Sequence, residues 1–313
     1  MERKIKRSVS PVRAYRLILT SDWHLRDDIP ACRERDEYVA AMENKLRFIR
    51  SLCEKHQAIL LHAGDLFDHW KPSPWLISLA LKYLPDETIV VPGQHDLPGH
   101  NLAELGKTGL HTLQEAGRIT VLSGGGRAFL RRAGDRFGTV YGYAFGEQAE
   151  NPSDDNLLKV LLWHHLTCER LQPWPGAEAS PSRAMKKQFS KYDLILTGDN
   201  HQQFTAGNWL VNPGSLLRMT SDQAYFEPAV YGWYDGMIER IPLPVEKGVV
   251  KIVANHAVER ESRDARMDAY ISRAQKKYED RLSFEKNLER HFKQNEERSG
   301  VEEITWKAVG DEK

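Results

Sequence analysis

The chain has 313 residues with 44 basic and 44 acidic side chains, so its formal net charge is zero and no overall charge indicates a polyanionic partner. It is long enough to bury a sizeable core, and its three cysteines, Cys32, Cys53 and Cys168, are too few and too scattered for a disulfide framework or a zinc site. Because no segment has the apolar length of a membrane span or a signal peptide, these properties indicate a cytoplasmic globular protein that is not embedded in a membrane.

The first half of the chain alternates between predicted strands and helices. Residues 1–13 are rich in Lys and Arg and predict a basic, flexible arm. After it, short aliphatic runs predict buried strands, and apolar residues at helical spacing predict the helices between them. The predicted strands are residues 17–19, 59–61 and 88–91, and the predicted helices are residues 38–52, 75–84 (opened by Pro74) and 102–115.

After Arg118 the pattern changes to short strands divided by glycine turns, which is typical of an antiparallel sheet. The dipeptide Asp235-Gly236 between two apolar runs predicts a tight hairpin. The order of elements predicts an α/β fold over residues 14–245, in which two packed mixed β-sheets are flanked by helices in a four-layer α/β/β/α sandwich. The predicted strands of this half are residues 119–122, 128–130, 138–143, 160–162, 194–196, 204–211, 229–234 and 237–243.

Residues 246–313 are dense in Glu, Lys and Arg, and their apolar residues lie mostly three, four or six positions apart. This spacing predicts a small helical extension with one narrow apolar stripe. Such a region is either a solvated helix, a small cap over the core, or a segment that docks on a partner.

Asp and His recur immediately after the predicted buried strands. The carboxyl ends of strands in α/β proteins are where side chains from distant segments gather. Carboxylate and imidazole groups collected there predict a site for two divalent metal ions. The residues that follow the strands in this way are Asp22, His24, Asp65, Asp68, Gln94, His95, Asp96, His164, His165, Asp199, Asn200 and His201.

The spacing of these residues suits phosphodiester cleavage. Asp22 and His24 lie two residues apart and therefore project from the same side of an extended segment toward one metal. Asp65 follows Gly64, which allows a sharp turn at the strand end, and it is the natural choice for a carboxylate that bridges two metals. A metal pair can provide a bridging hydroxide as nucleophile and neutralise the phosphoryl oxygens.

Together the motifs resemble the calcineurin-like metallophosphoesterase superfamily, whose pattern is D-x-H, G-D-x-x-D, G-N-H-D, a lone His and then G-H-x-H. Within that superfamily the chain is most similar to SbcD-type DNA nucleases of recombination and repair. The segments that carry this resemblance are Asp22-Trp23-His24, Gly64-Asp65 with Asp68, Gly93-Gln94-His95-Asp96, His165-Leu166-Thr167, Gly198-Asp199-Asn200-His201 and Pro213-Gly214-Ser215.

The resemblance implies a cofactor of two divalent ions, with Mn²⁺ expected first and Mg²⁺ as the alternative. It implies that His95 is the catalytic histidine that meets the phosphate or the leaving oxygen, and that Asp96 orients its ring. It implies as ligands of the first metal Asp22, His24, Asp65 and His201, and as ligands of the second Asp65, Gln94, His165 and Asp199.

Two positions depart from the family pattern, and both fall on the second metal. Gln94 stands where the family has asparagine, and Asp199 stands where the family has the first histidine of G-H-x-H. One interpretation is a remodelled site in which the extra carboxylate favours Mn²⁺ or Mg²⁺. The other is a weakened second site with slow or absent turnover.

Further residues are candidates for supporting roles. Asp68 either holds a ligand histidine or is a carboxylate at a helix start, and His164 is expected to pack or to support a ligand. The main-chain carbonyl near Asn200 is a possible additional contact. The basic residues nearest to motifs, and thus candidates for contacting substrate, are Arg26, Lys71, Lys186, Lys187 and Arg218.

The resulting hypothesis is an SbcD-like DNA nuclease, an exonuclease with some endonuclease activity. One alternative is a phosphatase or phosphodiesterase for a small or non-nucleic-acid substrate, which a closed apolar pocket would favour. Another is a non-catalytic DNA-binding or assembly subunit whose second metal site has decayed. The resemblance also implies an SbcC-like coiled-coil ATPase partner that docks through the C-terminal helices, and a homodimer in which residues 101–117 are the candidate contact.

Overall fold

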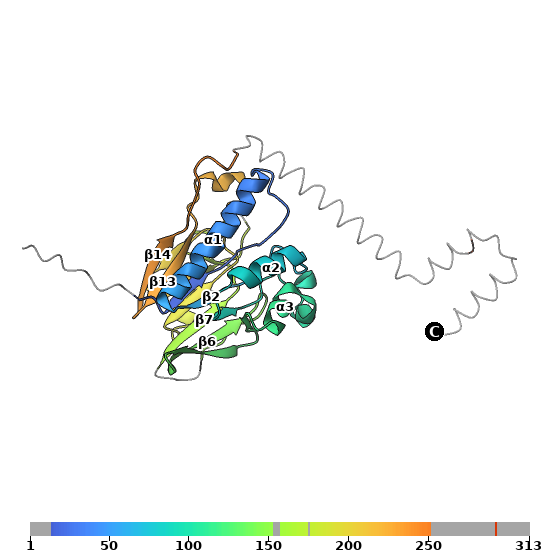
Figure 1. The fold of residues 1–313 in the computed structure, drawn as a ribbon. Helices are drawn as coiled ribbons and strands as arrows, with labels where there is room; N and C mark the ends of the chain where they lie inside the picture. The colour runs from blue at the N-terminus through green and yellow to red at the C-terminus, as the bar shows by residue number, and fades with distance from the viewer. Residues whose placement is uncertain (1–13, 153–156, 175, 252–291, 293–313) are drawn as a thin grey trace, which may run out of the picture. The chain divides into compact units, whose positions relative to one another are not determined.

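The computed structural model describes residues 14–152, 157–174, 176–251 and 292, and Figure 1 shows its fold. The basic arm predicted for residues 1–13 lies outside the described residues. So do nearly all of the residues for which a helical extension and a partner-docking segment are predicted.

One sheet has six strands, and four of them are parallel. β1 (Leu17–Thr20), β2 (Ile59–His62), β3 (Thr88–Val90) and β4 (Thr120–Val121) pair in that order. β13 (Ala229–Tyr234) pairs antiparallel with β1, and β14 (Met237–Pro242) completes the sheet. The predicted hairpin between β13 and β14 is confirmed, because Asp235 and Gly236 both have positive φ, 44° and 80°, as a tight two-residue turn requires.

The second sheet also has six strands, in the order β11-β12-β10-β7-β6-β5. β6, β7, β10 and β12 are parallel to one another, whereas the edge strands β5 and β11 pair antiparallel with β6 and β12. A separate two-stranded ladder joins β8 to β9. The bounds of these strands are β5 Gly126–Arg132, β6 Asp135–Tyr143, β7 Leu158–Trp163, β8 Thr167–Cys168, β9 Ser180–Pro181, β10 Leu194–Thr197, β11 Phe204–Ala206 and β12 Leu210–Asn212.

The two sheets pack face to face, and helices cover the outer face of each. In β1, Leu17 and Leu19 face the second sheet, while Ile18 between them faces the helices. Helices α1, α2 and α3 cover the first sheet (Figure 1), and α4 packs on the second. The helices are α1 Arg35–His56, α2 Pro74–Tyr83, α3 Gly109–Glu115 and α4 Ser182–Gln188, with 3₁₀ turns at Pro98–His100, Leu102–Lys107 and Ser221–Tyr225.

The predicted four-layer α/β/β/α class is therefore confirmed for the described residues. Burying each large aliphatic side chain contributes about 1.5–3 kcal/mol, which explains why strands buried on both faces consist of Leu, Ile and Val. Among the described residues, no helix has the length and hydrophobicity needed to cross a membrane.

Three local predictions are wrong. The helix expected at residues 102–115 is a 3₁₀ turn followed by α3, because the side chain of Thr108 caps the backbone N–H of His111 and restarts the helix. The strand expected at residues 204–211 is the hairpin β11–β12, which turns at Gly207 with φ of 57°. Residues 119–122 were expected in the antiparallel sheet, but β4 extends the parallel sheet beside β3.

The parallel strand pairings determine where the loops with the predicted ligand residues converge. Because β1, β2 and β3 are parallel neighbours, the loops after them leave the first sheet at the same edge. The loops after β7 and β10 do the same in the second sheet. The five loops carry the predicted ligand residues.

Candidate metal centre

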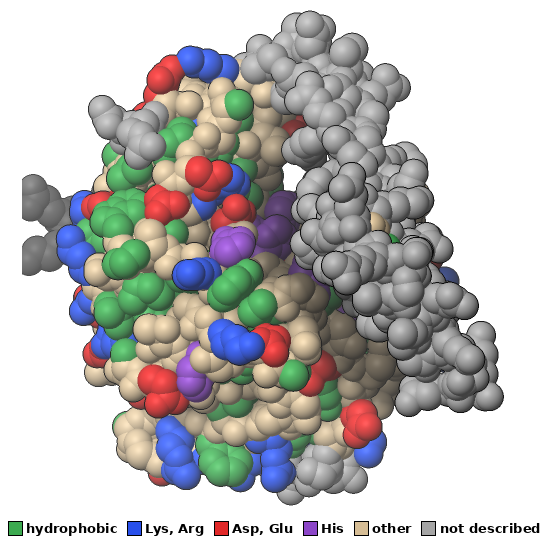
Figure 2. All heavy atoms as spheres, turned by 90° about the vertical axis from the view of Figure 1, so that its right-hand side faces the viewer, with side chains coloured by type: hydrophobic (Ala, Val, Ile, Leu, Met, Phe, Trp, Pro, Cys, Tyr) green, Lys and Arg blue, Asp and Glu red, His purple; other side chains and the backbone are tan. Residues whose placement is uncertain are grey.

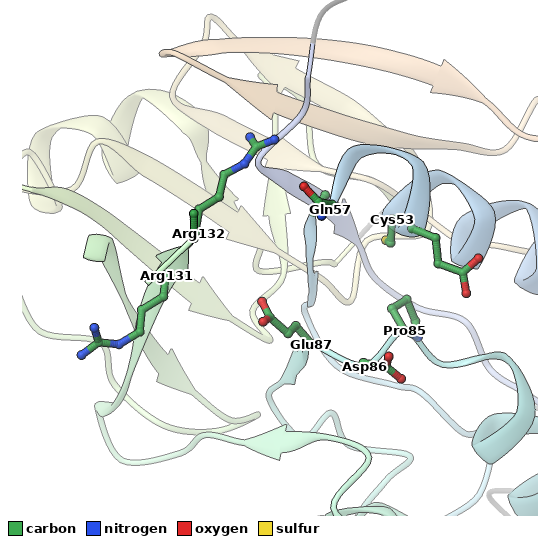
Figure 3. Close-up of a pocket in the computed structure, with 10 residues that line it drawn as sticks. Cys53, Gln57, Pro85, Asp86, Glu87, Arg131 and Arg132 are labelled. Carbon is green, nitrogen blue, oxygen red and sulfur yellow. The ribbon is translucent and has the colours of Figure 1, made fainter. Parts of the chain in front are cut away.

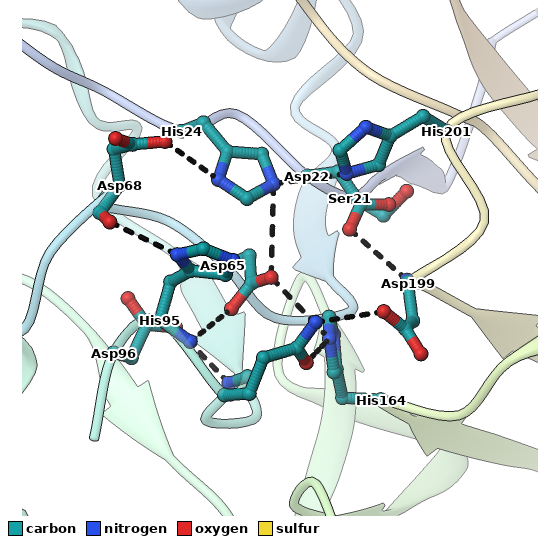
Figure 4. A network of polar contacts seen from close by, with 12 residues as sticks. Ser21, Asp22, His24, Asp65, Asp68, His95, Asp96, His164, Asp199 and His201 are labelled. Carbon is teal, nitrogen blue, oxygen red and sulfur yellow. Dashed lines mark hydrogen bonds and ion pairs between the residues drawn. The ribbon is translucent and has the colours of Figure 1, made fainter. Parts of the chain in front are cut away.

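Five loops bring the predicted ligands other than His165 together between the carboxyl ends of the two sheets (Figure 4). The backbone N–H of Asp22 donates to the carbonyl of Gly64 at 3.0 Å, and that of His24 donates to the carbonyl of Asp65 at 3.0 Å. The loop after β1 is thereby fixed to the loop after β2, which brings Asp22 and His24 close to Asp65.

Four residues of the centre have a left-handed backbone. Asp22, His24, Asp65 and Asp199 have φ of 48°, 43°, 55° and 76°. This conformation costs about 1–3 kcal/mol for a non-glycine residue and persists only where the surroundings fix it. The concentration of such residues here indicates that the folded protein holds a functional arrangement against local preference.

Gly64 and Gly93 allow the loops to approach this closely. A Cβ on Gly64 would lie 2.2 Å from Nδ1 of His164, and one on Gly93 would lie 2.1 Å from Oδ1 of Asp65. Any side chain at either position would displace a residue of the centre.

His24 and His201 face each other in one half of the centre, with 3.1 Å between their Nε2 atoms. Nδ1 of His24 lies 3.2 Å from Oδ1 of Asp68, so the proton of a neutral ring belongs on Nδ1 and the lone pair on Nε2 points inward. That Nε2 lies 3.6 Å from Oδ2 of Asp65. Asp22, His24 and His201 offer ligand atoms within 4.8 Å of one another.

His164 defines the other half. Its Nδ1 lies 2.6 Å from the carbonyl oxygen of Ala63, which places the proton of a neutral ring on Nδ1. The lone pair on Nε2 then faces Oε1 of Gln94 at 2.6 Å and Oδ2 of Asp65 at 3.5 Å. The ligand atoms of His164, Gln94 and Asp65 therefore converge on one point, where a shared cation could be held.

Unpartnered carboxylate oxygens support the same conclusion. Oδ2 of Asp22 and Oδ2 of Asp65 are buried and have no hydrogen-bond partner among the described residues. Buried polar atoms are rarely left unsatisfied, and an ion is one of the standard explanations. Because Asp65 contacts both halves of the centre, it is positioned to be shared by two ions.

Gln94 and Asp199, which depart from the family pattern, contact each other. The side-chain amide nitrogen of Gln94 donates to Oδ1 of Asp199 at 2.7 Å, while its Oε1 faces His164. The backbone N–H of Asp199 donates to Oδ1 of Asp22 at 3.0 Å. The longer glutamine thus connects His164 to the carboxylate that stands in place of the histidine.

The electrostatics match a ligand set. Burial raises the pKa of Asp65 well above its usual range, and the nearby Asp96 and Asp22 raise it further. Burial also raises the pKa of Asp22, but the histidines around it, His201 first, lower it more, so the net pKa is below the usual value. Burial lowers the pKa of His24 to about 4, so this ring is neutral at pH 7 and able to coordinate.

His95 differs from the other histidines of the centre because it is exposed. Its backbone N–H donates to Oδ1 of Asp65 at 2.8 Å, and its Nδ1 lies 3.0 Å from the carbonyl oxygen of Asp68. The ring is thereby anchored at Nδ1 beside the shared carboxylate. This leaves Nε2 for a ligand or substrate.

Asp96 contacts backbone N–H groups and not the ring of His95, which it is predicted to orient. Its carboxylate accepts from the backbone N–H groups of Leu66, Phe67 and Gly93 at 3.2, 3.1 and 3.0 Å. It therefore ties the loop after β3 to the loop after β2. The carbonyl of Asp68, not Asp96, holds the His95 ring.

His165 does not join the ligand groups found among the described residues. Its ring stacks on Trp163 with centroids 3.8 Å apart, and its Nε2 lies 2.8 Å from Oγ of Ser180. Strand alternation explains this. Leu162 faces the other sheet and Trp163 faces α4, so the next inward residue is His164 and the next outward one is His165. The histidine beside Asp65 is therefore His164, whereas the H-L-T match selects His165.

This difference predicts contrasting variants. We expect His164→Ala to weaken Mn²⁺ binding by more than the roughly 10- to 100-fold that loss of an outer contact costs, because it removes a donor to the metal. His165→Ala is the matched control and is expected to leave the affinity unchanged. Calorimetric titration of both variants with Mn²⁺ decides between them, and the opposite order would restore His165 as the ligand.

The remaining candidates are divided between the centre and the scaffold. Asn200 is buried, and its side chain donates to the carbonyl of Thr167 at 2.7 Å. Its own carbonyl accepts from Nδ2 of Asn212 at 2.6 Å, a side-chain contact that sequence reasoning missed. Asn212 directly follows an apolar run at the end of β12, and nothing in that pattern specifies which backbone carbonyl its side chain contacts.

The basic candidates for substrate contact differ in availability. Lys71, Lys186 and Lys187 are exposed, and Arg26 is paired with Asp68 at 3.3 Å. Arg218 is 4% exposed, and its guanidinium donates to the carbonyls of Ala224 and Glu246. The prediction that Arg218 contacts substrate is therefore wrong.

Surface pockets elsewhere are separate from the centre. The pocket in Figure 3, with a volume of 370 Å³, is lined by Gln57 and Ala58 just before β2, by Glu87 just before β3 and by Arg131 at the end of β5. It therefore lies at the amino ends of the parallel strands, opposite the metal centre.

The match to a family model agrees with the motifs. The family model for calcineurin-like phosphoesterases matches residues 15–203. A solved metallophosphoesterase from Sphaerobacter thermophilus is 11% identical, with 74% of this chain and 89% of that chain covered and a TM-score of 0.34. No curated protein matches the chain.

Proposed function

The chain belongs to the calcineurin-like phosphoesterase family, whose members are metal-dependent hydrolases, and we propose that it is a DNA phosphodiesterase of the SbcD-like nuclease type. The observation that carries this proposal is the position of Asp65. Its carboxylate lies between two groups of converging ligand atoms, and exposed His95 is anchored beside it.

The residues present fit a pair of divalent ions. Asp22, His24, His201 and Asp65 would hold one ion, and Asp65, His164 and Gln94 would hold the other, with Asp199 adjacent. Carboxylate and amide oxygens suit Mn²⁺ and Mg²⁺, whereas imidazole ligands suit transition metals, so the mixed set favours Mn²⁺ over Mg²⁺. When bound, such ions neutralise phosphoryl oxygens and lower the pKa of water.

His95 is the group of the chain best suited to transfer a proton. With Nδ1 held by the Asp68 carbonyl, a protonated ring presents its Nε2–H outward, where a phosphate or a leaving oxygen would lie. Asp68 also lies against His24 through its carboxylate. Asp68 thus orients both a metal ligand and the proton donor.

The openness of the centre supports a large substrate. His95 is exposed, and Gln94, Asp199 and His201 are partly exposed. Figure 2 shows histidine side chains reaching the surface of this face, with basic and acidic side chains beside them. An enclosed apolar pocket would favour a small ligand, whereas an open polar site suits a phosphodiester backbone.

Cleavage of end-labelled DNA tests this function. We expect wild-type protein to cleave single- or double-stranded DNA with Mn²⁺ and not with EDTA, and Mg²⁺ is to be compared. Bis-p-nitrophenyl phosphate is the second substrate. If this small diester is cleaved while DNA stays intact, the substrate assignment is wrong, and if neither is cleaved, the enzymatic proposal is wrong.

The proposal includes partners. An SbcC-like ATPase would dock through residues 246–313, and a second copy of the chain would contact residues 101–117. Co-purification and sedimentation of the full chain would test each.

A further inference from the structure

Lys45 is a buried basic residue that makes no ion pair with a carboxylate of the described residues. It lies on α1 and is only 3% exposed. Its Nζ donates to the carbonyl oxygen of Leu216 at 2.7 Å, and among the described residues no carboxylate lies within ion-pair distance of it. A buried ammonium without an ionic partner is costly, so its retention calls for an explanation.

The surroundings of Lys45 add to that cost. Burial, then the guanidinium groups of Arg218 and Arg33, lower the pKa of Lys45 to about 7, and Glu37 is the acidic group that opposes them. Arg33 also donates to a carbonyl of the same loop, that of Arg218, at 2.7 Å. Lys45 of α1 and Arg33, which lies just before α1, therefore hold backbone oxygens of residues 213–218, which follow β12.

Residues 213–218 in turn contact two predicted ligands of the first metal. The backbone N–H of Leu216 donates to the carbonyl of Asp22 at 3.1 Å, and the N–H of Ser215 donates to the carbonyl of His201 at 3.1 Å. A Cβ on Gly214 would lie 2.6 Å from that same His201 carbonyl, so the approach is tight. Leu216 thus joins Lys45 on one side to Asp22 on the other.

Asp22 needs such support. Its φ of 48° is unfavourable for a residue with a side chain, and its loop keeps this conformation only while neighbouring hydrogen bonds fix it. Displacing the Leu216 carbonyl would move the adjoining peptide that bonds Asp22. The carboxylate would then turn relative to His24 and His201.

We propose that Lys45 is a positioning residue for the first metal, which holds Asp22 and His201 in place through the backbone of Leu216 and the adjoining Ser215. This inference rests on the metal site of the proposed function. It assigns to a buried lysine of α1 a role in metal affinity rather than in contact with substrate.

Titration of the metal-free full chain with Mn²⁺, followed by the EPR signal of the free ion, tests the proposal. We expect Lys45→Met to weaken the binding of one ion about 10- to 100-fold, the range typical for groups that orient ligands. Lys45→Arg, which keeps a donor, is expected to lie between Lys45→Met and wild type. Lys55→Met, at an exposed position of the same helix, is the control and should bind as wild type does.

Urea unfolding in EDTA separates positioning from a loss of folding. Lys45→Met removes a buried charge that Arg33 and Arg218 repel. The urea concentration at the midpoint of unfolding of this variant is therefore expected to be no lower than that of wild type. Should Lys45→Met fail to fold, Lys45→Gln, which is shorter but polar, carries the same comparison. Mn²⁺ binding by the folded variant as tight as that of wild type would overturn the inference, whereas absence of binding by wild type would overturn the proposed function.

Discussion

Asp65→Asn is expected to abolish phosphodiester hydrolysis while stabilising the metal-free protein. The substitution removes the carboxylate that lies beside His24 in one half of the centre and beside His164 in the other. We expect the rate to fall by at least about 10³-fold, which corresponds to about 4 kcal/mol of lost transition-state stabilisation. Asn tolerates the left-handed backbone of this position, so the fold should persist.

The stabilising effect follows from the pKa of Asp65. Its folded pKa is raised above the ordinary 3.8 by burial and by Asp96 and Asp22, so the folded protein binds this proton more tightly than the unfolded chain. The stability of metal-free wild type should therefore fall as the pH rises above 3.8 toward the folded pKa. Asp65→Asn lacks this penalty.

Urea unfolding in EDTA across the pH range, together with initial rates in Mn²⁺, measures both effects. Asp135→Asn, at an exposed aspartate of the β5–β6 hairpin, is the matched control and should change neither. A variant that keeps more than a tenth of the wild-type rate would show that Asp65 is not the shared ligand.

His95→Gln is expected to lower kcat by about 10²- to 10⁴-fold without loss of bound metal, because it removes a proton donor and keeps a neutral polar side chain. The ring is exposed and anchored to the Asp68 carbonyl, so its removal should not disturb the buried ligands. Steady-state kinetics and Mn²⁺ titration on the same preparation provide the two readouts.

The titration also decides between two roles for His95. Its ring nitrogen lies within 4.8 Å of ligand atoms of His24 and Asp65, so it is also within reach of an ion. Weaker Mn²⁺ binding in His95→Gln would make it a ligand instead of a proton donor. His111→Gln, on α3 away from the centre, controls for general effects of replacing a histidine.

Much of the fold follows from local sequence. Runs such as Leu17 to Leu19 are short, aliphatic and bounded by polar residues, and this combination suits strands buried on both faces. Because parallel strands end at one edge, the residues just after them could be predicted to converge. The break at Thr108 escaped prediction because helical apolar spacing continues across it.

Side-chain partners within the centre were less predictable. The alternation of inward and outward side chains along β7 favours His164 as the residue that faces the centre. The H-L-T motif match favours His165 instead. The contact between Gln94 and Asp199 joins residues 105 positions apart, in loops that follow strands of different sheets, and nothing local encodes it. Arg218 and Lys45 lie buried against backbone carbonyls, whereas charged residues are usually at the surface.

Counting bound Mn²⁺ in wild-type protein tests the central claim, that Asp65 is shared by two ions, most directly. Titration combined with EPR of the bound ions is expected to give two Mn²⁺ per chain with a spin-coupled spectrum, because a common carboxylate keeps the ions a few ångströms apart. A single bound ion, or two ions without magnetic coupling, would contradict the account.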